Sequence, residues 1–284
     1  MRLVALKLCP ALLALALLPS AHAMGPACSA RHPPPETLAA MFDMAAATAQ
    51  TLDAQDGVDV AIAARGGQDL TRYGLRHSHL AIVLRDAAGQ WQALHLLNRC
   101  KSDSSQLYRE GLVNLVGESA LHTDLRVGIP SAPVRAALRA LPQGDASAAR
   151  VLHQPRYSML AWPGGDDYQN SNQWVLEVVA AAIAQARDGQ HLDNRAAARR
   201  WLAARHFQPS VLHIGLGKRL GARWFADNVA VSDHPARERI SGNYSVVTVE
   251  SVFDFLQQQH VLEREMAVSH RPVPAAAAAG DAPP

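Results

Sequence analysis

Two apolar runs separated by a short polar loop constrain the fold of this chain more than any other feature. Residues 79–84 (HLAIVL) and 91–97 (WQALHLL) have the composition of β-strands. The loop between them, residues 85–90, contains Asp86 and Gly89, which favour a tight reversal of the chain. The two runs therefore predict a β-hairpin.

The rest of the chain predicts a mixture of helices and strands. Helical spacing of apolar residues or helix-start signals predict helices over residues 35–52, 104–113, 132–141, 194–205 and 252–258, and a long helix that begins at Asn170 or Ser171. Strands are predicted over residues 58–63, 211–214 and 245–249. The elements do not alternate as βαβ units, which predicts an α+β fold with an antiparallel sheet packed on helices.

The domain boundaries follow from composition. Residues 24–35 are rich in proline and predict a flexible leader, and residues 261–284 end in a run of alanine and proline that predicts a disordered tail. Residues 36–260 have the length of one domain and show no internal repeat. We therefore expect a single α+β domain between two unstructured ends.

The first 23 residues have the three parts of a cleavable secretory signal peptide. Arg2 and Lys7 provide a basic start, residues 11–18 are apolar, and Ala21 and Ala23 flank one residue as in a cleavage site. The apolar run is shorter than the roughly 20 residues that span a bilayer. We expect a periplasmic or secreted protein with no transmembrane segment after cleavage.

Charge and cysteine content limit the expected partners. Without Arg2 and Lys7, the 27 basic residues fall to 25, which equals the number of acidic residues. A neutral chain without interleaved basic and aromatic residues does not favour nucleic acid as a partner. Cys28 and Cys100 remain after cleavage, and an oxidising compartment predicts that they form a disulfide. Two free thiols are the alternative.

A serine and two histidines form a candidate catalytic site. Ser171 lies at the predicted start of the long helix, where unpaired N–H groups favour a developing negative charge. His79 opens the first hairpin strand and could act as a base, and His95 on the second strand could orient it. The alternative for Ser171 is a structural role as the N-cap of the helix.

These residues also carry a family resemblance. Residues 78–84 (SHLAIVL), His95 and residues 170–174 (NSNQW) resemble the circularly permuted branch of the NlpC/P60 papain-like superfamily. Residues 72–79 (RYGLRHSH) and 168–174 (YQNSNQW) are similar to an exported bacterial family catalogued as domain of unknown function 2145. The resemblance implies a papain-like core in which His79 is the base and His95 the orienting residue.

One residue departs from the superfamily pattern. The superfamily's hydrolases carry cysteine at the start of the helix, and this chain carries Ser171. A hydroxyl ionises less readily than a thiol, so the site needs a well-placed base and an oxyanion hole. Asn170, Asn172, Tyr168 and Trp174 are expected to line the cleft.

Three functions are compatible with the sequence. The first is a serine-variant hydrolase of the cell envelope that acts on an amide, ester or thioester, with a peptidoglycan peptide or a lipid-linked acyl group as substrate and no cofactor. The second is a non-catalytic periplasmic binding or structural module. The third is a zinc hydrolase, since His77 and His79 lie two apart on a strand and could bind a metal with His95.

The predicted 194–205 helix carries a cluster of basic residues. We expect a solvated face for Arg195, Arg199, Arg200 and Arg205.

Overall fold

A six-stranded antiparallel sheet forms the centre of the molecule. The computed structural model describes residues 33–100, 102–117, 124–141, 147–219 and 228–269. The strand order is β4-β3-β2-β1-β5-β8, and every neighbouring pair is antiparallel. In chain order the strands are β1 Val60–Arg65, β2 His79–Arg85, β3 Trp91–Asn98, β4 Ser105–Gly111, β5 Asp124–Pro130 and β8 Leu262–Ser269. The predicted α+β class is confirmed.

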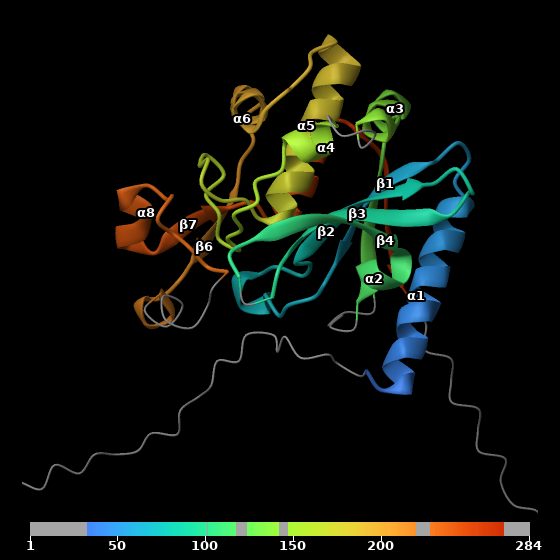
Figure 1. Cartoon of the computed structure of the whole chain (residues 1–284), viewed down its shortest axis with the longest axis horizontal. Coiled ribbons are helices and arrows are strands. Elements are labelled where there is room, and N and C mark those ends of the chain that lie inside the picture. The colour runs from blue at the N-terminus through green and yellow to red at the C-terminus, as the bar shows by residue number, and fades with distance from the viewer. Residues whose placement is uncertain (1–32, 101, 118–123, 142–146, 220–227, 270–284) are drawn as a thin grey trace, which may run out of the picture.

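Helices cover both faces of this sheet (Figure 1). One face packs against α3 (Ala132–Ala140), α5 (Ser171–Asp188) and α9 (Val249–Gln258), and the other against α1 (Pro35–Asp53) and α2 (Leu112–Val116). The helices α4 (Ala148–Val151) and α6 (Arg195–Ala204) lie beside α5. None of the helices within the described ranges combines the length and apolarity that a bilayer-crossing helix needs.

The double covering explains why the hairpin strands read as continuous apolar runs. Leu80 and Ile82 of β2 belong to the core on the α5 side, and Ala81 and Val83 belong to the core on the α1 side. A strand buried on both faces has no solvent-facing side on which polar residues would alternate. The apolar run of β2 is therefore a direct consequence of its place inside the sheet.

Helix α5 is the central helix of the domain. All its residues from Ser171 to Ala184 are buried, and such all-round burial requires a helix without a polar solvent-facing stripe. Its N-cap is Asn170, whose side chain accepts a hydrogen bond from the backbone N–H of Gln173 at 2.7 Å. It ends at Gly189, which has a φ of 62°. The sequence left Asn170 and Ser171 as alternative caps, and the structure selects Asn170.

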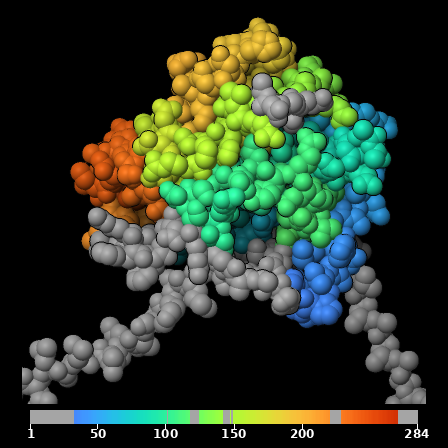
Figure 2. All heavy atoms as spheres, viewed as in Figure 1, coloured from blue at the N-terminus to red at the C-terminus, as the bar shows by residue number. Residues whose placement is uncertain are grey.

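A small second sheet adjoins the main one. It pairs β6 (Ser210–His213) with β7 (Asn243–Val246), and α8 (Ala236–Ser241) precedes β7. Leu212 and Tyr244 are central to its apolar cluster. Figure 2 shows this orange region next to the yellow-green residues that lead into α5. The predicted 245–249 strand is shorter than expected because Thr248 caps α9 and ends the extended segment.

Two predictions about the elements are wrong. Residues 104–113 were expected to be helical, but residues 105–111 form β4, which pairs along its whole length with β3. The local helix preference of these residues is overridden there by strand pairing with β3, which is apolar. The tail predicted over 261–284 begins too early, because residues 262–269 form the edge strand β8. Its charged residues, such as Glu263 and Arg264, are typical of an exposed edge strand.

Several predicted segments lie outside the described residues. They include the signal peptide, the leader up to residue 32, and the tail from residue 270. The strand β5 had no counterpart among the predicted elements.

Gly128 of β5 provides a test of the packing between the sheet and α9. A Cβ atom at this position would lie 2.9 Å from Cε1 of Phe253 and 3.1 Å from Cδ2 of Leu262. We expect Gly128→Val to lower the free energy of unfolding by about 1–3 kcal/mol, because the added methyl groups overpack the core. Urea unfolding followed by circular dichroism measures this change.

Gly111 provides the matched control. A Cβ atom there meets no atom within 4 Å, and Gly111 is also the last residue of a strand. Gly111→Val should therefore change the midpoint of urea unfolding much less than Gly128→Val does. Equal midpoints for the two variants would contradict the packing of β5 against α9.

Candidate functional site

A chain of hydrogen bonds connects the start of α5 to three strands of the sheet. The hydroxyl of Ser171 lies 3.1 Å from Nδ1 of His79, and Nε2 of His79 lies 3.0 Å from Nδ1 of His95. Nε2 of His95 lies 3.2 Å from a carboxylate oxygen of Glu110. The structure thus brings together the three residues that the sequence singled out and adds a fourth.

Glu110 fixes the direction of the whole chain. An ionised carboxylate can only accept a hydrogen bond, so Nε2 of His95 carries a proton and Nδ1 of His95 accepts. Nε2 of His79 then donates to His95, and Nδ1 of His79 is left to accept from the Ser171 hydroxyl. Both rings are neutral in this assignment, and the free lone pair of the first imidazole faces Ser171. This is the proton arrangement that a general base requires.

The sequence analysis missed Glu110 because it placed residues 104–113 in a helix. In the structure, β4 pairs with β3 so that Tyr108 lies opposite His95. Glu110 follows Tyr108 by two residues, and positions two apart project from the same face of a strand. The signal that could have found it is an acidic residue on a strand next to His95.

The electrostatic surroundings keep His79 uncharged. Burial, the positive charge of Arg65 and the neighbouring His95 hold the pKa of His79 well below its ordinary value of 6.5. Burial also lowers the pKa of His95, although its contact with Glu110 opposes that effect. Because the pKa of His79 is held well below its ordinary value, this ring is neutral and available as a base at neutral pH.

Arg65 is the nearest source of positive charge to these rings. It is opposite His79 in the ladder between β1 and β2. Its Nε and Nη1 atoms are buried and have no hydrogen-bond partner within the described ranges, and burial lowers its pKa. Its side chain lies close to Gly67, where a Cβ atom would collide with Nη1. The positive charge of Arg65 opposes protonation of His79.

Asn170, and not Ser171, caps α5, which leaves the Ser171 hydroxyl for another partner. Asn170 also donates through Nδ2 to the carbonyl oxygen of Val247 at 3.2 Å and to that of Met159 at 3.5 Å. One side chain therefore joins the start of α5 to two other segments. The expected structural role of Ser171 as a cap is wrong, and its hydroxyl points at His79 instead.

Hydrogen-bond donors surround the Ser171 hydroxyl. The N–H groups of Ser171 and Asn172 occupy the first turn of α5, where the helix supplies no acceptor. The hydroxyl of Tyr157 interacts with that of Ser171, and burial raises the pKa of Tyr157 to about 12. That phenol keeps its proton at neutral pH and can donate. The arrangement offers donors for a negatively charged oxygen near Ser171.

A cavity of about 380 Å³ opens at Ser171. Its lining includes Tyr157, Asn170, Ser171 and Asn172, together with apolar side chains of β6 and β7. Small-molecule sites typically have volumes of ~300–1,000 Å³, so the cavity is of the size of a binding site. The candidate nucleophile thus faces a space that a substrate could occupy.

Two residues expected in the cleft lie elsewhere. Trp174 is fully buried in the core, where its indole N–H donates to the carbonyl oxygen of Ala149 at 2.9 Å. The hydroxyl of Tyr168 accepts a hydrogen bond from Arg156 at 2.6 Å. Asn170 and Asn172 line the cavity, whereas Tyr168 and Trp174 do not.

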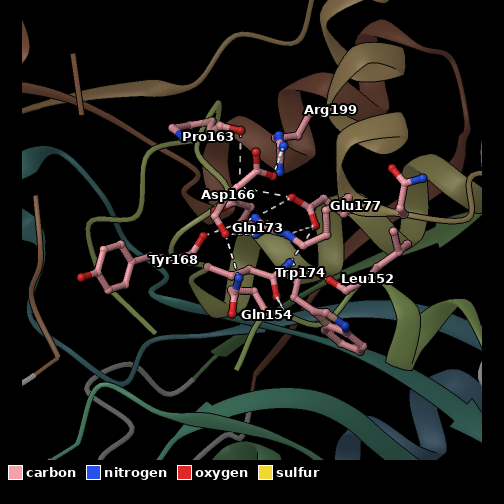
Figure 3. Close-up of polar contacts among 12 residues, drawn as sticks. Leu152, Gln154, Pro163, Asp166, Tyr168, Gln173, Trp174, Glu177 and Arg199 are labelled. Atoms are coloured by element: carbon pink, nitrogen blue, oxygen red, sulfur yellow. Dashed lines mark hydrogen bonds and ion pairs between the residues drawn. The ribbon is translucent and has the colours of Figure 1, made fainter. Parts of the chain in front are cut away.

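A buried ion pair supports the segment before α5 (Figure 3). Arg195 donates to both carboxylate oxygens of Glu177, at 2.9 and 3.1 Å. It also donates to the backbone carbonyls of Asp166 and Tyr168, at 3.2 and 3.3 Å. Gln173, in the first turn of α5, donates to the same carboxylate at 3.2 Å. The pair therefore holds the turn that delivers the chain to Ser171.

The role of Arg195 corrects an expectation. The sequence placed it on a solvated face together with Arg199, Arg200 and Arg205, but the side chain of Arg195 is buried. Arg200 is exposed, and Arg199 and Arg205 are half-buried. Burial raises the pKa of Glu177, and Arg195 opposes this shift. A carboxylate this deeply buried needs such a partner to stay charged.

The three histidines considered for a zinc site are not arranged around a common point. Within the part of the chain that the structure describes, no group of three or more His, Cys, Asp or Glu side chains could hold a metal ion. Both ring nitrogens of His79 are engaged with Ser171 and His95. Nε2 of His77 lies 3.5 Å from a carboxylate oxygen of Asp124. His77 is not part of the hydrogen-bond chain from Ser171 through His79 and His95 to Glu110, which we call the relay. The geometry favours the serine hypothesis over the zinc hypothesis.

Cys100 is disulfide-bonded. Cys28 lies outside the described residues, so the pairing of Cys28 with Cys100 stays a prediction.

Comparison with known proteins gives one match. Residues 51–256 match the model of a family described as "Uncharacterized protein conserved in bacteria (DUF2145)". No curated protein and no solved structure matches the chain.

Removing Arg195 tests the support of the site. We expect Arg195→Met to lower the free energy of unfolding by about 3–5 kcal/mol, because Glu177 would be left as an unpaired buried charge. Glu177→Gln in the same chain should restore part of that loss. Chemical denaturation measures all three proteins.

Arg200→Met is the matched control, because Arg200 lies on the same helix and is exposed. Arg200→Met should change the free energy of unfolding by no more than about 0.5 kcal/mol. A loss as large as that of Arg195→Met would show that the effect belongs to α6 in general and not to the ion pair.

Proposed function

The chain belongs to the family described as "Uncharacterized protein conserved in bacteria (DUF2145)", and we propose that it is an exported serine hydrolase that cleaves an amide, ester or thioester in the cell envelope. Ser171 is the nucleophile, His79 the general base, and His95 with Glu110 the residues that orient and stabilise the base. Export rests on the signal peptide predicted from residues 1–23.

One observation carries the proposal. The Ser171 hydroxyl lies 3.1 Å from Nδ1 of His79, within the reach that proton transfer requires. The second nitrogen of that ring is held by His95, which Glu110 holds in turn. A nucleophile, a base and an orienting group in sequence is the arrangement that activates a hydroxyl.

The first half of the reaction forms an acyl-enzyme. The Ser171 oxygen attacks the carbonyl carbon of the substrate while its proton passes to Nδ1 of His79. The carbonyl oxygen becomes negative and accepts hydrogen bonds from the N–H groups of Ser171 and Asn172 and from the Tyr157 hydroxyl. The bond to the leaving group then breaks, and the leaving group takes the proton from His79.

The second half releases the acid. Water attacks the carbonyl carbon of the acyl-enzyme and gives a proton to Nδ1 of His79. The bond between that carbon and the Ser171 oxygen breaks, and the proton returns from His79 to Ser171. Glu110 acts through His95 in both halves, because its negative charge favours the transient positive charge on the paired rings.

We also propose that the core is papain-like, of the permuted NlpC/P60 type. The chain order supports this, because the strand with His79 precedes the helix with Ser171, as the resemblance implies. The contact between Ser171 at the start of α5 and His79 on that strand also supports the proposal, in which Ser171 stands where the superfamily carries cysteine.

Hydrolysis of 4-nitrophenyl acetate tests the proposal. We expect Ser171→Ala to remove the enzymatic rate, and His79→Ala to lower kcat at least about 100-fold because general base catalysis typically contributes ~10²–10⁴. Release of 4-nitrophenolate measures the rate.

Ser105→Ala is the matched control. Ser105 is also buried and its hydroxyl lies 3.0 Å from Nε2 of His153, but it faces the backbone carbonyls of Gln154 and Pro155 and does not line the cavity. This variant should keep the activity. Turnover that survives in Ser171→Ala would sink the assignment, and the absence of turnover in the unaltered protein would favour a non-catalytic module.

The pH dependence gives a second test. The pKa of His79 is well below 6.5, so kcat/KM should stay high below that pH and fall only when the ring is protonated. Arg65→Gln removes a positive charge that opposes this protonation. The pKa of His79 should then rise, and the acid limb should move to higher pH.

The pH profiles of the two proteins on 4-nitrophenyl acetate measure this shift. Arg200→Gln serves as the control, since Arg200 is an exposed arginine that does not line the cavity and does not contribute to the pKa of His79. An acid limb that stays in place in Arg65→Gln would mean that another group controls the rate.

A further inference from the structure

We propose that the cavity next to Ser171 is an acyl-chain pocket, so that the substrate is an ester or thioester of an apolar carboxylic acid and not a peptide. This inference rests on the proposed hydrolase function and names its substrate class. The acyl carbonyl would lie at Ser171, and the hydrocarbon chain would fill the cavity.

The lining of the cavity carries the inference. Its walls come from the connection between β1 and β2, from the segment before α5, and from the small sheet of β6 and β7. These three segments contribute the apolar side chains of Leu75, Met159, Leu160, Leu212, Ile214 and Val246. A cavity with such a lining stabilises hydrocarbon, because burial removes apolar surface from water.

The cavity has polar lining residues away from the start of α5, among them Gln68, Arg72 and Lys218, and a further polar group at the place where the reaction would occur. Asn170, Ser171 and Asn172 at the start of α5, together with Tyr157, are the lining residues that belong to or adjoin the relay. Asn170 is already engaged with Gln173, Val247 and Met159. An acyl ester has a single polar group to satisfy, and this group meets the donors around Ser171.

A peptide would fit this lining poorly. Each further residue of a peptide brings an N–H and a carbonyl group that need partners once they leave water. The apolar walls from Leu212, Ile214 and Val246 offer side chains that cannot form hydrogen bonds. The same walls accept methylene groups without such a penalty, so the cavity discriminates between the two substrate classes.

A chain-length series tests the pocket. We expect kcat/KM for 4-nitrophenyl esters to rise about three- to four-fold per added methylene from acetate through butyrate to octanoate, until the chain fills the cavity. The gain arises because each methylene leaves water in the transition state. A rate that stays flat from acetate to octanoate would overturn the proposal.

Two tryptophan variants locate the effect. Leu160→Trp narrows the cavity and should lower the ratio of kcat/KM for the octanoate ester to kcat/KM for the acetate ester at least about ten-fold. Val211→Trp is the matched control, because Val211 precedes a lining residue in β6 but is 64 % exposed and lies outside this cavity. Equal losses on both esters in Leu160→Trp would contradict an acyl pocket.

A binding experiment separates this inference from the hydrolase proposal. Calorimetric titration of octanoate into Ser171→Ala needs no chemistry, and we expect binding with a negative heat-capacity change that Leu160→Trp weakens at least about ten-fold. If octanoate binds but no ester is hydrolysed, the pocket stands and the hydrolase fails. If the acetate ester is hydrolysed through Ser171 but octanoate does not bind, the hydrolase stands and the acyl pocket is wrong.

Discussion

The hydrogen bonds of Asn170 are the constraint on which the site depends. Its side-chain oxygen caps α5, and its side-chain nitrogen reaches the backbone of Val247 and Met159, so that the start of α5, the segment before it and the segment before α9 meet at one residue. Because Asn170 satisfies the first turn of the helix, the next residue, Ser171, has a hydroxyl that is not required for capping. That hydroxyl is the one that faces His79.

The hydrogen-bond chain that ends at Glu110 and the Glu177–Arg195 ion pair have different roles: the first is suited to proton transfer, and the second holds the turn before α5. Glu110 compensates a positive charge only through His95, whereas Glu177 is neutralised directly by Arg195. The Glu110 carboxylate lies on the edge strand β4, where its negative charge can stabilise a positive charge on His79 through His95. The Glu177 carboxylate is fully buried and ties the turn before α5 to α6. Removing the charge of Glu110 would therefore affect the proposed catalysis, whereas removing the charge of Glu177 or Arg195 would affect the stability of the fold.

A neutral His79 next to Arg65 has two opposing consequences. It keeps the base free of protons over a wide pH range, but it also makes the imidazolium of the reaction harder to form. A serine nucleophile has a much higher pKa than a thiol and needs a strong base, so Glu110 and the oxyanion donors must offset the effect of Arg65. In the proposed hydrolase, a serine nucleophile therefore depends more on the surrounding electrostatics than a cysteine would.

The sequence predicted the elements whose patterns are local. The apolar hairpin of residues 79–97, the start of α5 and the approach of His79, His95 and Ser171 agree with the structure. Glu110, Arg65 and the partner of Glu177 could not be predicted, because their roles depend on strand register and on contacts across long separations. The edge strand β8 was missed for the same reason, since it is recognisable as a strand only from its pairing with β5.

Covalent labelling of the serine is the most direct test of an activated Ser171. A fluorophosphonate reacts with serine only when a base withdraws the hydroxyl proton and the oxyanion is stabilised. We predict that peptide mapping of the labelled protein finds the adduct on Ser171, and that His79→Ala slows labelling at least about 100-fold. Labelling at the same rate in His79→Ala, or an adduct on a different residue, would contradict the account.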